Sequence, residues 1–248
     1  MHTGKHTMHM NVVLDHGNTS AKIGIFEDDV LKERIAFGKT EDVLAFLANF
    51  SGGRIIVSSV NTAIKELPNA LRGFPEVVML TPATPLPLKN KYASAETLGM
   101  DRIAAACGAW HLFPYGNSLV IDAGTCITYE FVDSSGAYLG GAISPGLSMR
   151  LRAMHTFTAR LPLVEPETNP ELTGDSTISC MQSGAFWGMV DEIDGAIARY
   201  RDKYPDLHVI LTGGDAAFFE NKLKASIFAS PELVLVGLNR ILSHNANL

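Results

Sequence analysis

The 248-residue sequence has few cysteines, and their spacing fits no common cysteine motif. The three cysteines are Cys107, Cys126 and Cys180, and no two of them form a Cys-x-x-Cys pair. A small, odd number of widely spaced cysteines argues against a disulfide scaffold or a zinc ribbon. We therefore expect reduced, buried thiols in a cytoplasmic protein.

Excess basic charge and long apolar runs are also lacking. Twenty lysines and arginines stand against 26 aspartates and glutamates, which gives a net charge of −6. General binding to nucleic acid or to a membrane surface needs a basic surface, so we predict neither partner. No apolar stretch approaches the roughly 20 residues that cross a bilayer, and the N-terminus has no signal-peptide core.

Three familiar nucleotide and hydrolase motifs are missing as well. The segment Phe37-Gly38-Lys39-Thr40 resembles the end of a Walker loop, but Glu33 stands where the first glycine of that loop belongs. No Gly-x-Gly-x-x-Gly follows a strand, and no Gly-x-Ser-x-Gly is present. These absences leave a Walker-type site, a Rossmann dinucleotide site and a serine hydrolase unsupported.

The composition is that of a packed globular protein, with 46% hydrophobic and 19% charged residues. Strand and helix patterns alternate along the chain, which predicts an α/β fold with mixed sheets. The run Pro114-Tyr115-Gly116-Asn117 breaks the chain, so we predict an N-terminal lobe over residues 11–116 and a C-terminal lobe over 117–248.

Residues 1–10 look unlike the rest of the chain. They contain His2, His6 and His9, which could bind a metal weakly. A disordered or artificially added lead is the simpler interpretation, and it is the one we adopt.

One short unit occurs twice. Asp15-His16-Gly17-Asn18-Thr19 and Asp122-Ala123-Gly124-Thr125 each follow an apolar run and lead into a second one, a pattern that predicts strand, turn and strand. Small turn residues let backbone N–H groups approach an anion, and an aspartate beside them can hold a cation or a metal-bound water. Two such units predict two lobes that face one another across a nucleotide, as in a kinase or an ATPase.

The two turns differ in the residues that come after them. Lys22 adds a positive charge after the first turn, whereas Tyr129 and Glu130 stand after the second. The first turn alone could be an ordinary hairpin, but the duplication favours phosphate binding. In the second turn, Asp122 could coordinate a cation and the Thr125 hydroxyl could contact a phosphate oxygen. We expect Glu130 to be a solvated strand residue.

Three further segments each allow two interpretations. Asp101-Arg102 at a helix start is either a charged first turn or a general base beside an anchor for negative charge. Thr212-Gly213-Gly214-Asp215 could admit an adenosine or could be a plain turn capped by Asp215. A long helix predicted over Thr177–Tyr204, capped by Asp175 or Ser176, could pack in the core or, through Gly184 and Gly188, against a second subunit.

Taken together, these residues resemble the type III pantothenate kinase family, from about Asn11 to the last predicted helix. That family belongs to the actin-like ATPase superfamily of acetate and sugar kinases. The motifs that carry the resemblance are Asp15–Lys22, Tyr92 with Leu98–Arg102, Asp122–Thr125, Gly140–Gly146, Thr177 with Met181–Gly184, and Gly213–Asp215. The resemblance implies two similar lobes of the actin-like (ribonuclease H-like) type, and ATP-dependent phosphorylation of pantothenate as the first step of coenzyme A synthesis.

The resemblance also implies roles for individual residues. Asp101 would accept the proton of the pantothenate hydroxyl, Asp15 would help to hold Mg²⁺, and Asp122 would hold K⁺ or NH₄⁺. The family is dimeric, and Thr177 would reach the substrate site from the partner subunit. The implied ATP site comprises Asp15, His16, Gly17, Asn18, Thr19, Ser20, Ala21, Lys22 and Thr125, and the implied pantothenate site comprises Tyr92, Gly99, Met100, Asp101, Arg102 and Thr177.

This chain departs from the usual family pattern at three positions. Ala95 stands in place of a common proline, Glu130 in place of a common aspartate, and Ser176 in place of a common asparagine. None of these changes removes a residue with an implied catalytic role. Two alternatives remain: a regulator of transcription that keeps the kinase fold, and another small-molecule kinase of the superfamily. The chain has no basic stripe for DNA, and the Tyr92–Arg102 spacing would have no purpose in a sugar or acetate kinase.

Overall fold

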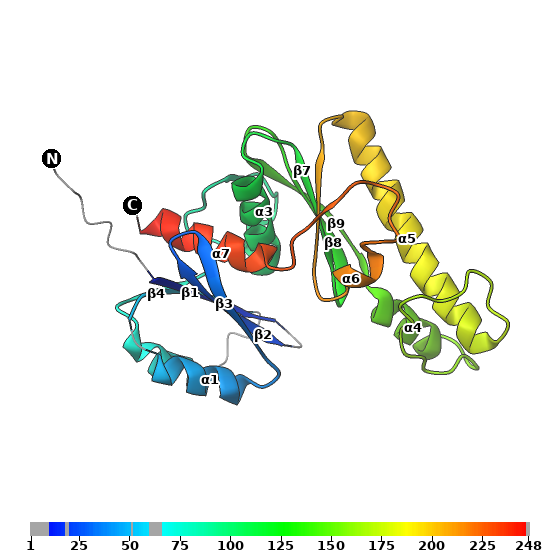
Figure 1. Ribbon diagram of the computed structural model, residues 1–248, viewed down its shortest axis with the longest axis horizontal. Coiled ribbons are helices and arrows are strands. Elements are labelled where there is room, and N and C mark those ends of the chain that lie inside the picture. The colour runs from blue at the N-terminus through cyan, green and yellow to red at the C-terminus, as the bar shows by residue number, and fades with distance from the viewer. Residues whose placement is uncertain (1–9, 18–19, 51, 60–65, 247–248) are drawn as a thin grey trace. The chain divides into compact units, whose positions relative to one another are not determined.

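The structure is a computed structural model that describes residues 10–17, 20–50, 52–59 and 66–246 (Figure 1). Contacts divide the chain into two compact units. The first comprises Met1–Leu112 with Glu232–Leu248, and the second comprises Phe113–Pro231. The proposed lead over residues 1–10 lies outside the described residues except for Met10, which begins the first strand.

A five-stranded mixed sheet forms the centre of the first unit, with the order β3-β2-β1-β4-β5. Its central strand β1 pairs antiparallel with β2 and parallel with β4. The predicted hairpin is confirmed. The sequence also predicts strands over Val30–Phe37 and Arg54–Ser58, and both are confirmed. The strands are β1 (Met10–His16), β2 (Ala21–Glu27), β3 (Val30–Phe37), β4 (Arg54–Ser59) and β5 (Glu76–Met79).

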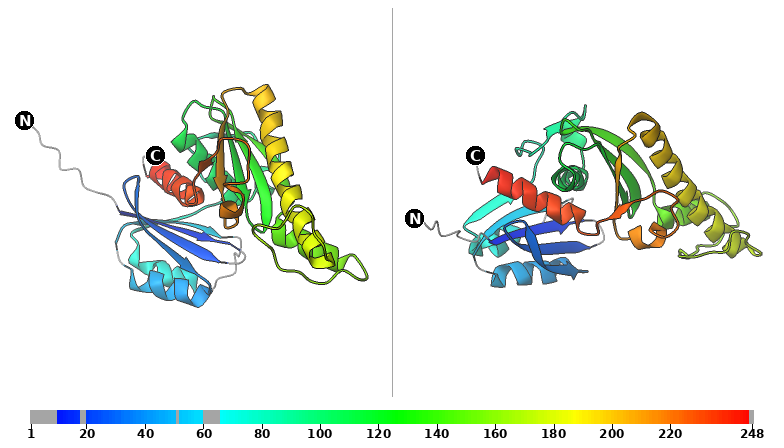
Figure 2. Two further views of the ribbon diagram at one scale, coloured as in Figure 1. Left: turned by 45° about the vertical axis from the view of Figure 1, so that its right-hand side comes forward. Right: turned by 45° about the horizontal axis from the view of Figure 1, so that its top comes forward.

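Helices cover both faces of this sheet, and α1 (Thr40–Asn49) and α7 (Leu233–Asn245) lie on opposite sides of it (Figure 2). Val12 and Leu14 belong to the core cluster that includes α1. Successive side chains of a strand point to opposite faces, so Asn11 and Asp15 lie on the other face. There the Asn11 Nδ2 donates to Asn239 Oδ1 of α7 at 2.7 Å.

The last helix therefore belongs to the first unit, which differs from the prediction of one lobe over residues 117–248. Helix α7 packs on β1 and β4 and lies alongside α3 (Met100–Leu112). Two glycines allow α3 and α7 to pack closely. A Cβ at Gly237 would lie 1.8 Å from the Ala104 carbonyl oxygen, and a Cβ at Gly108 would lie 2.5 Å from the Leu233 carbonyl oxygen. This backbone contact joins segments that are far apart in sequence, so no local sequence pattern predicts it.

Helix α3 is buried over a continuous run, Arg102–Ala109, rather than on one side only. The apolar residues Ile103, Ala106, Cys107 and Trp110 recur at helical spacing and predict one apolar face, which is narrower than the buried surface of the helix. Small side chains in this run allow neighbouring segments to approach the helix from several directions. The exposed end of the helix is its first turn, where Asp101 lies.

The remaining elements of the first unit are short: α2 (Leu67–Ala70), the 3₁₀ helices η1 (Leu71–Gly73) and η2 (Ala95–Thr97), and the strand β6 (Lys89–Asn90). The sequence also predicts a helix around Thr62–Leu71, and part of this range lies outside the described residues. Its described part is a single turn with Pro68 at the start, where a missing N–H costs nothing. Thr40 begins α1 and does not cap it, because Lys39 occupies the N-cap position.

The second unit contains a sheet with the strand order β11-β10-β7-β8-β9. Strands β7, β8 and β9 form an antiparallel series, and β10 pairs parallel with β7. The strands are β7 (Ser118–Ala123), β8 (Cys126–Val132), β9 (Ala137–Pro145), β10 (His208–Thr212) and β11 (Phe228–Ala229). The predicted repetition of strand, turn and strand is confirmed, since β7-turn-β8 matches β1-turn-β2.

Helix α5 (Thr177–Lys203) runs along one face of this sheet (Figure 1) and contributes Phe186, Met189 and Ile193 to the core. Its cap is Ser176 and not Asp175: the Ser179 N–H donates to Ser176 Oγ at 3.2 Å, and the Ser176 N–H donates to Ser179 Oγ at 3.0 Å. Ile178 lies at helical spacing from Met181 and Ala185, which predicts that it is buried with them. It is half exposed, so the buried stripe begins at Met181.

Two short helices complete the second unit, α4 (Leu147–Thr156) and α6 (Ala216–Phe219). The sequence predicts a helix over about Ala216–Ala225, but α6 ends at Phe219. The Lys224 N–H instead donates to the carboxylate of Asp194 on α5, at 3.1 Å, which holds this backbone away from a helical path. Asp215 occupies the N-cap position without a side-chain capping bond.

The cysteines are all thiols, but they do not share one environment. Cys107 is buried, Cys126 is half-buried and Cys180 is exposed, so the expectation of buried thiols was wrong for Cys180. Within the described residues, no helix has both the length and the apolar character needed to cross a membrane.

Candidate functional site

The first turn joins β1 to β2 and places a carboxylate opposite a lysine. Asp15 pairs with Lys22 in the β1–β2 register. The turn closes through Gly17, whose N–H donates to the Ser20 carbonyl oxygen at 3.1 Å. Asn18 and Thr19, predicted to contact phosphate, lie outside the described residues. Ala21, the last of the predicted ATP-binding group before Lys22, is buried in the core and offers only its backbone.

His16, also predicted in the ATP site, is held by the fold. Its Nε2 lies 3.2 Å from Thr40 Oγ1 of α1, and its Nδ1 lies 3.5 Å from Ser59 Oγ of β4. The ring is 8% exposed. Both ring nitrogens therefore have partners inside the unit, and the imidazole fixes the end of β1 between α1 and β4.

Asp15 has a strongly perturbed carboxyl group. Burial raises its pKa from 3.8 to about 6, the positive charge of Lys22 opposes this rise, and the negative charge of Asp101 adds to it. Asp15 and Asp101 therefore influence one another within the first unit although they are far apart in sequence. A buried carboxylate beside a second carboxylate and a lysine is a common arrangement in sites that bind cations and phosphates.

Asp101 and Arg102 point to different environments at the start of α3. Asp101 is exposed, and its Oδ1 accepts from the Arg102 N–H at 2.8 Å. Arg102 is 8% exposed, and its guanidinium carbon lies 5.5 Å from the centre of the Tyr92 ring. The structure thus brings together Tyr92 and Arg102, two residues predicted in the substrate site, through a cation–π contact.

Gly99 and Met100 complete this corner. A Cβ at Gly99 would lie 2.5 Å from Asp101 Oδ1, so a larger residue here would displace the carboxylate from this position. Met100 begins α3 and is half-buried. The Tyr92 N–H donates to Asn90 Oδ1 at 2.9 Å, which fixes the approach to the corner. Both sequence interpretations of Asp101 remain compatible with this geometry: it belongs to the first helical turn, and its carboxylate faces solvent.

The second turn, Asp122–Thr125, is enclosed by two other turns of the second unit. The Gly124 N–H donates to the Cys126 carbonyl at 3.0 Å. A Cβ at Gly213 would lie 2.2 Å from the Ala123 carbonyl oxygen and 2.5 Å from Asp122 Oδ1. The Asp215 N–H also donates to the Ala123 carbonyl oxygen, at 2.9 Å. The Thr212–Asp215 segment therefore lies directly on the second turn, a relation that the sequence could not reveal.

Gly146 approaches the same turn from the junction of β9 and α4. Its N–H donates to the Thr125 carbonyl at 3.2 Å, and a Cβ here would lie 2.0 Å from the Gly124 carbonyl oxygen. Asp122 is half-buried and Thr125 is exposed. Burial raises the pKa of Asp215 above its usual range. The Thr212–Asp215 segment and the β9–α4 junction thus both contact the backbone of the Asp122–Thr125 turn.

Glu130 was expected to be solvated, and this prediction was wrong. Its side chain is fully buried, and its Oε2 accepts from the Tyr138 hydroxyl at 2.5 Å. The alternating pattern of β8 gave no warning, because residues 129–132 are all buried whichever face of the strand they occupy. A hydroxyl partner offsets the cost of burying a carboxyl group.

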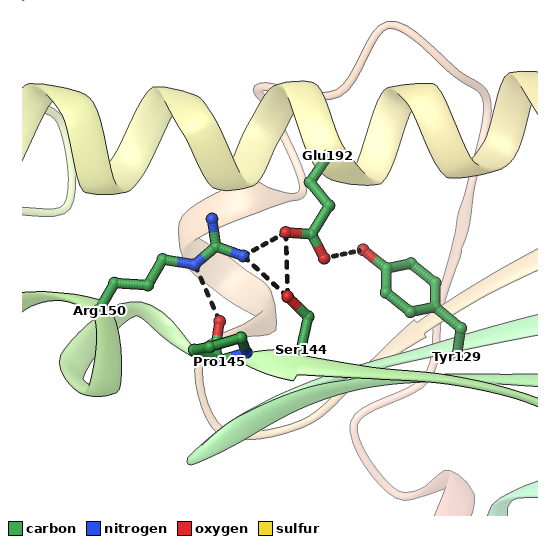
Figure 3. Close-up of polar contacts among 5 residues, drawn as sticks. All are labelled: Tyr129, Ser144, Pro145, Arg150 and Glu192. Atoms are coloured by element: carbon green, nitrogen blue, oxygen red, sulfur yellow. Dashed lines mark hydrogen bonds and ion pairs between the residues drawn. The ribbon is translucent and has the colours of Figure 1, made fainter. Parts of the chain in front are cut away.

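A polar cluster that the sequence analysis did not predict lies beside the Asp122–Thr125 turn (Figure 3). The Tyr129 hydroxyl donates to Glu192 Oε1 at 3.1 Å, and Ser144 Oγ donates to Glu192 Oε2 at 3.2 Å. Arg150 Nη2 forms an ion pair with the same Glu192 oxygen, and Arg150 Nε donates to the Pro145 carbonyl at 2.8 Å. Its members come from β8, β9, α4 and α5, so no local spacing could have found them.

Thr177 is the first residue of α5 and is exposed. It lies at an open cavity of about 650 Å³ that is also lined by Met154, Leu161 and Cys180. Nothing in the second unit places Thr177 beside the Asp122–Thr125 turn. Its role at the pantothenate site of a partner subunit stays a prediction.

The described residues offer little support for a metal bound by protein groups alone. Among them there is no group of three or more His, Cys, Asp and Glu side chains that could hold a metal ion. A single carboxylate such as Asp15 nevertheless fits Mg²⁺ that arrives with a nucleotide, because Mg²⁺ keeps several waters and takes most other ligands from phosphate.

Comparisons with known proteins identify the family of this chain. The family model described as type III pantothenate kinase matches residues 11–199. The type III pantothenate kinase of Christiangramia forsetii is 44% identical over 244 residues, and the match covers 95% of this chain and 99% of that protein. The Bacteroides fragilis (strain ATCC 25285) protein of the same name is 46% identical over 239 residues, with coverage of 95% and 98%.

Solved structures show the fold. A conserved Baf family protein from Campylobacter jejuni superposes with a TM-score of 0.65 at 24% identity and covers 96% of this chain and 100% of its own. A ROK family glucokinase from Streptomyces griseus gives a TM-score of 0.53 at 11% identity, with coverage of 95% and 99%. The predicted actin-like ATPase fold, with mixed sheets flanked by helices, is confirmed. With the family match and two relatives aligned over nearly their full length, the chain belongs to the type III pantothenate kinase family.

Proposed function

We propose that this protein transfers the γ-phosphoryl group of ATP to the primary hydroxyl of pantothenate, which yields 4′-phosphopantothenate and begins coenzyme A synthesis. Family membership supports the reaction. The observation that carries the assignment to residues is the electrostatic interaction of Asp15, Lys22 and Asp101 within one unit. Phosphoryl transfer needs a group that accepts a proton and charges that position and neutralise the phosphates.

The β1–β2 turn would bind phosphate oxygens of ATP. Gly17 leaves room for a close approach to the backbone, and Lys22 supplies a positive charge across the hairpin from Asp15. Asp15 would hold Mg²⁺ that enters with ATP, and this ion would screen the phosphate charges. Binding of a cation favours the ionised carboxylate, so it would offset the cost that burial imposes on Asp15.

Asp101 would accept the proton of the pantothenate hydroxyl as its oxygen attacks the γ-phosphorus and ADP leaves. The carboxylate is exposed at the first turn of α3, where a substrate can reach it. Arg102 and Tyr92, joined by their cation–π contact, would hold the rest of pantothenate, with Gly99 and Met100 as neighbours. Positioning would supply most of the rate enhancement.

The Asp122–Thr125 turn would bind a monovalent cation and a phosphate oxygen. Asp122 supplies a carboxylate oxygen at this turn, a ligand of the kind that hard cations prefer, which supports K⁺ or NH₄⁺ at this point. The exposed Thr125 hydroxyl would contact ATP. We also propose a homodimer in which Thr177 contributes to the partner's pantothenate site. The cytoplasmic location remains a prediction from the cysteine content.

A coupled assay of ADP release tests this function. ATP is supplied with and without pantothenate, each in the presence and absence of K⁺, and the product is identified by mass spectrometry. We expect ADP release that requires pantothenate and is stimulated by K⁺. An Asp101→Asn variant should lose turnover and still bind ATP, because a neutral amide cannot accept the proton. Silence of the wild-type protein in every condition would reject the kinase and favour a regulator on the same fold.

A further inference from the structure

We propose that Arg150 and Glu192 are positioning residues for the Asp122–Thr125 turn, and that their ion pair sets the affinity for ATP. The inference rests on the proposed function, since it assigns the turn to phosphate binding. Neither residue carries an implied role, and neither contacts the turn with its own side chain. Their effect would pass through the junction of β9 and α4.

The first step is the link between the ion pair and that junction. Arg150 lies on α4, and its side chain returns to the end of β9, where Nε donates to the Pro145 carbonyl at 2.8 Å and Nη2 lies 3.3 Å from Ser144 Oγ. The same Nη2 pairs with Glu192 of α5. A planar guanidinium with donors in a fixed fork thus ties three elements at one point (Figure 3).

The second step is the anchoring of Glu192. Its Oε1 accepts from the Tyr129 hydroxyl at 3.1 Å, and its Oε2 accepts from Ser144 Oγ at 3.2 Å as well as from Arg150. Tyr129 is buried in β8 and belongs to the core of the unit. Burial and the adjacent Glu192 carboxylate raise the pKa of the Tyr129 hydroxyl, so it remains a donor. The Arg150 side chain is 21% exposed and that of Glu192 is 30% exposed, so solvent screens the pair only in part.

The third step connects the junction with the turn. Gly146 follows Pro145 directly, its N–H donates to the Thr125 carbonyl at 3.2 Å, and no side chain would fit between its backbone and Gly124. The Arg150 N–H in turn donates to the Gly146 carbonyl at 3.0 Å. A displacement of the β9–α4 junction would therefore displace Gly124 and Thr125 as well, because the backbone contacts between them leave no free space.

Kinetic constants of four variants test this inference. Arg150→Ala should raise the KM for ATP about tenfold or more, since small displacements of binding groups cost up to about 100-fold. The KM for pantothenate should stay within about twofold, because Tyr92, Asp101 and Arg102 belong to the other unit. Arg150→Lys should fall between wild type and Arg150→Ala, because a single ammonium cannot reproduce the fork. The double variant Arg150→Ala/Glu192→Ala should match Arg150→Ala alone, because the two residues act as one unit.

Arg152→Ala is the matched control, since Arg152 lies on the same helix and is exposed. It should leave both KM values unchanged. The inference would be overturned if folded Arg150→Ala kept the wild-type KM for ATP. A lower melting temperature in that case would show that the ion pair has only a structural role. Folding is checked by circular dichroism. If Arg150→Ala does not fold, the KM for ATP of the milder variant Arg150→Lys decides the test.

Titration with a non-hydrolysable ATP analogue separates the two proposals. If the wild type binds the analogue but phosphorylates no pantothenate, the proposed function fails, and weaker analogue binding by Arg150→Ala still supports the positioning role. If the wild type phosphorylates pantothenate and Arg150→Ala binds the analogue with unchanged affinity, only the positioning role fails. A wild type that binds no nucleotide would overturn both.

Discussion

Replacing Asp15 with Asn should make the nucleotide-free protein more stable, and the gain should depend on pH. Burial raises the pKa of Asp15 from 3.8 to about 6. A shift of about two units corresponds to about 3 kcal/mol at 1.36 kcal/mol per unit. Above pH 6 the carboxylate is ionised in both the folded and unfolded states, and the folded state bears the full cost. The asparagine amide has a similar shape but no charge, so the variant avoids the cost of burying an ionised group.

The sign of the pH dependence is set by the bound protons. Between pH 3.8 and about 6 the folded protein holds a proton on Asp15 that the unfolded chain has lost. Wild-type stability therefore falls as pH rises through this window, relative to a variant that does not titrate there. The difference in unfolding free energy between Asp15→Asn and wild type should be below about 1 kcal/mol at pH 4 and reach about 2–3 kcal/mol by pH 7.

Urea denaturation of both proteins at pH 4.5, 5.5, 6.5 and 7.5, without nucleotide or divalent metal, measures this difference. Titrations elsewhere in the chain cancel, because the two proteins differ at one position. The same comparison in an Asp101→Asn background should give a smaller difference, since the Asp101 charge adds to the rise in the pKa of Asp15. A difference that does not change with pH would refute the reasoning. The more stable Asp15→Asn should also lose MgATP binding.

Other predictions concern single contacts. Gly237→Ala should destabilise the protein by about 1–3 kcal/mol in urea denaturation, because its Cβ would lie 1.8 Å from the Ala104 carbonyl oxygen. Gly184→Ala is the control: its Cβ would meet nothing within 4 Å, so stability should be unchanged or should rise by up to about 1 kcal/mol. Ser176→Ala should cost about 1 kcal/mol by removing the acceptor for the Ser179 N–H, and an unchanged melting temperature would show that this cap is not needed.

The sequence was most informative where structure depends on neighbouring residues. Both hairpins could be predicted, because each combines two apolar runs with a turn of small residues around Gly17 or Gly124. The start of α5 could be narrowed to two candidate caps, since a serine or an aspartate before an apolar stripe is a local signal. The bounds of these elements agree with the structure to within a few residues.

The sequence was least informative where distant segments meet. The assignment of the last helix to the second lobe failed because α7 packs beside α3 through Gly108 and Gly237, a contact that reflects the whole fold. The burial of Glu130 depends on a hydroxyl supplied by the next strand. The pairing of Arg150 with Glu192 joins two helices whose charged residues look like ordinary solvated positions in the sequence. Each of these contacts depends on a partner residue elsewhere in the chain, and the sequence distance to that partner follows no fixed pattern.

The return of the final helix to the first unit bears on synthesis of the protein. While the chain emerges from the ribosome, residues 113–231 form a continuous segment that can collapse as soon as it is exposed. The earlier segment cannot complete its packing at that stage. Asn11 on β1 and Gly108 on α3 find their partners in α7, which is translated after residue 231. We therefore expect the unit that is made first to mature last, and a nascent chain halted before residue 232 to be a substrate for chaperones.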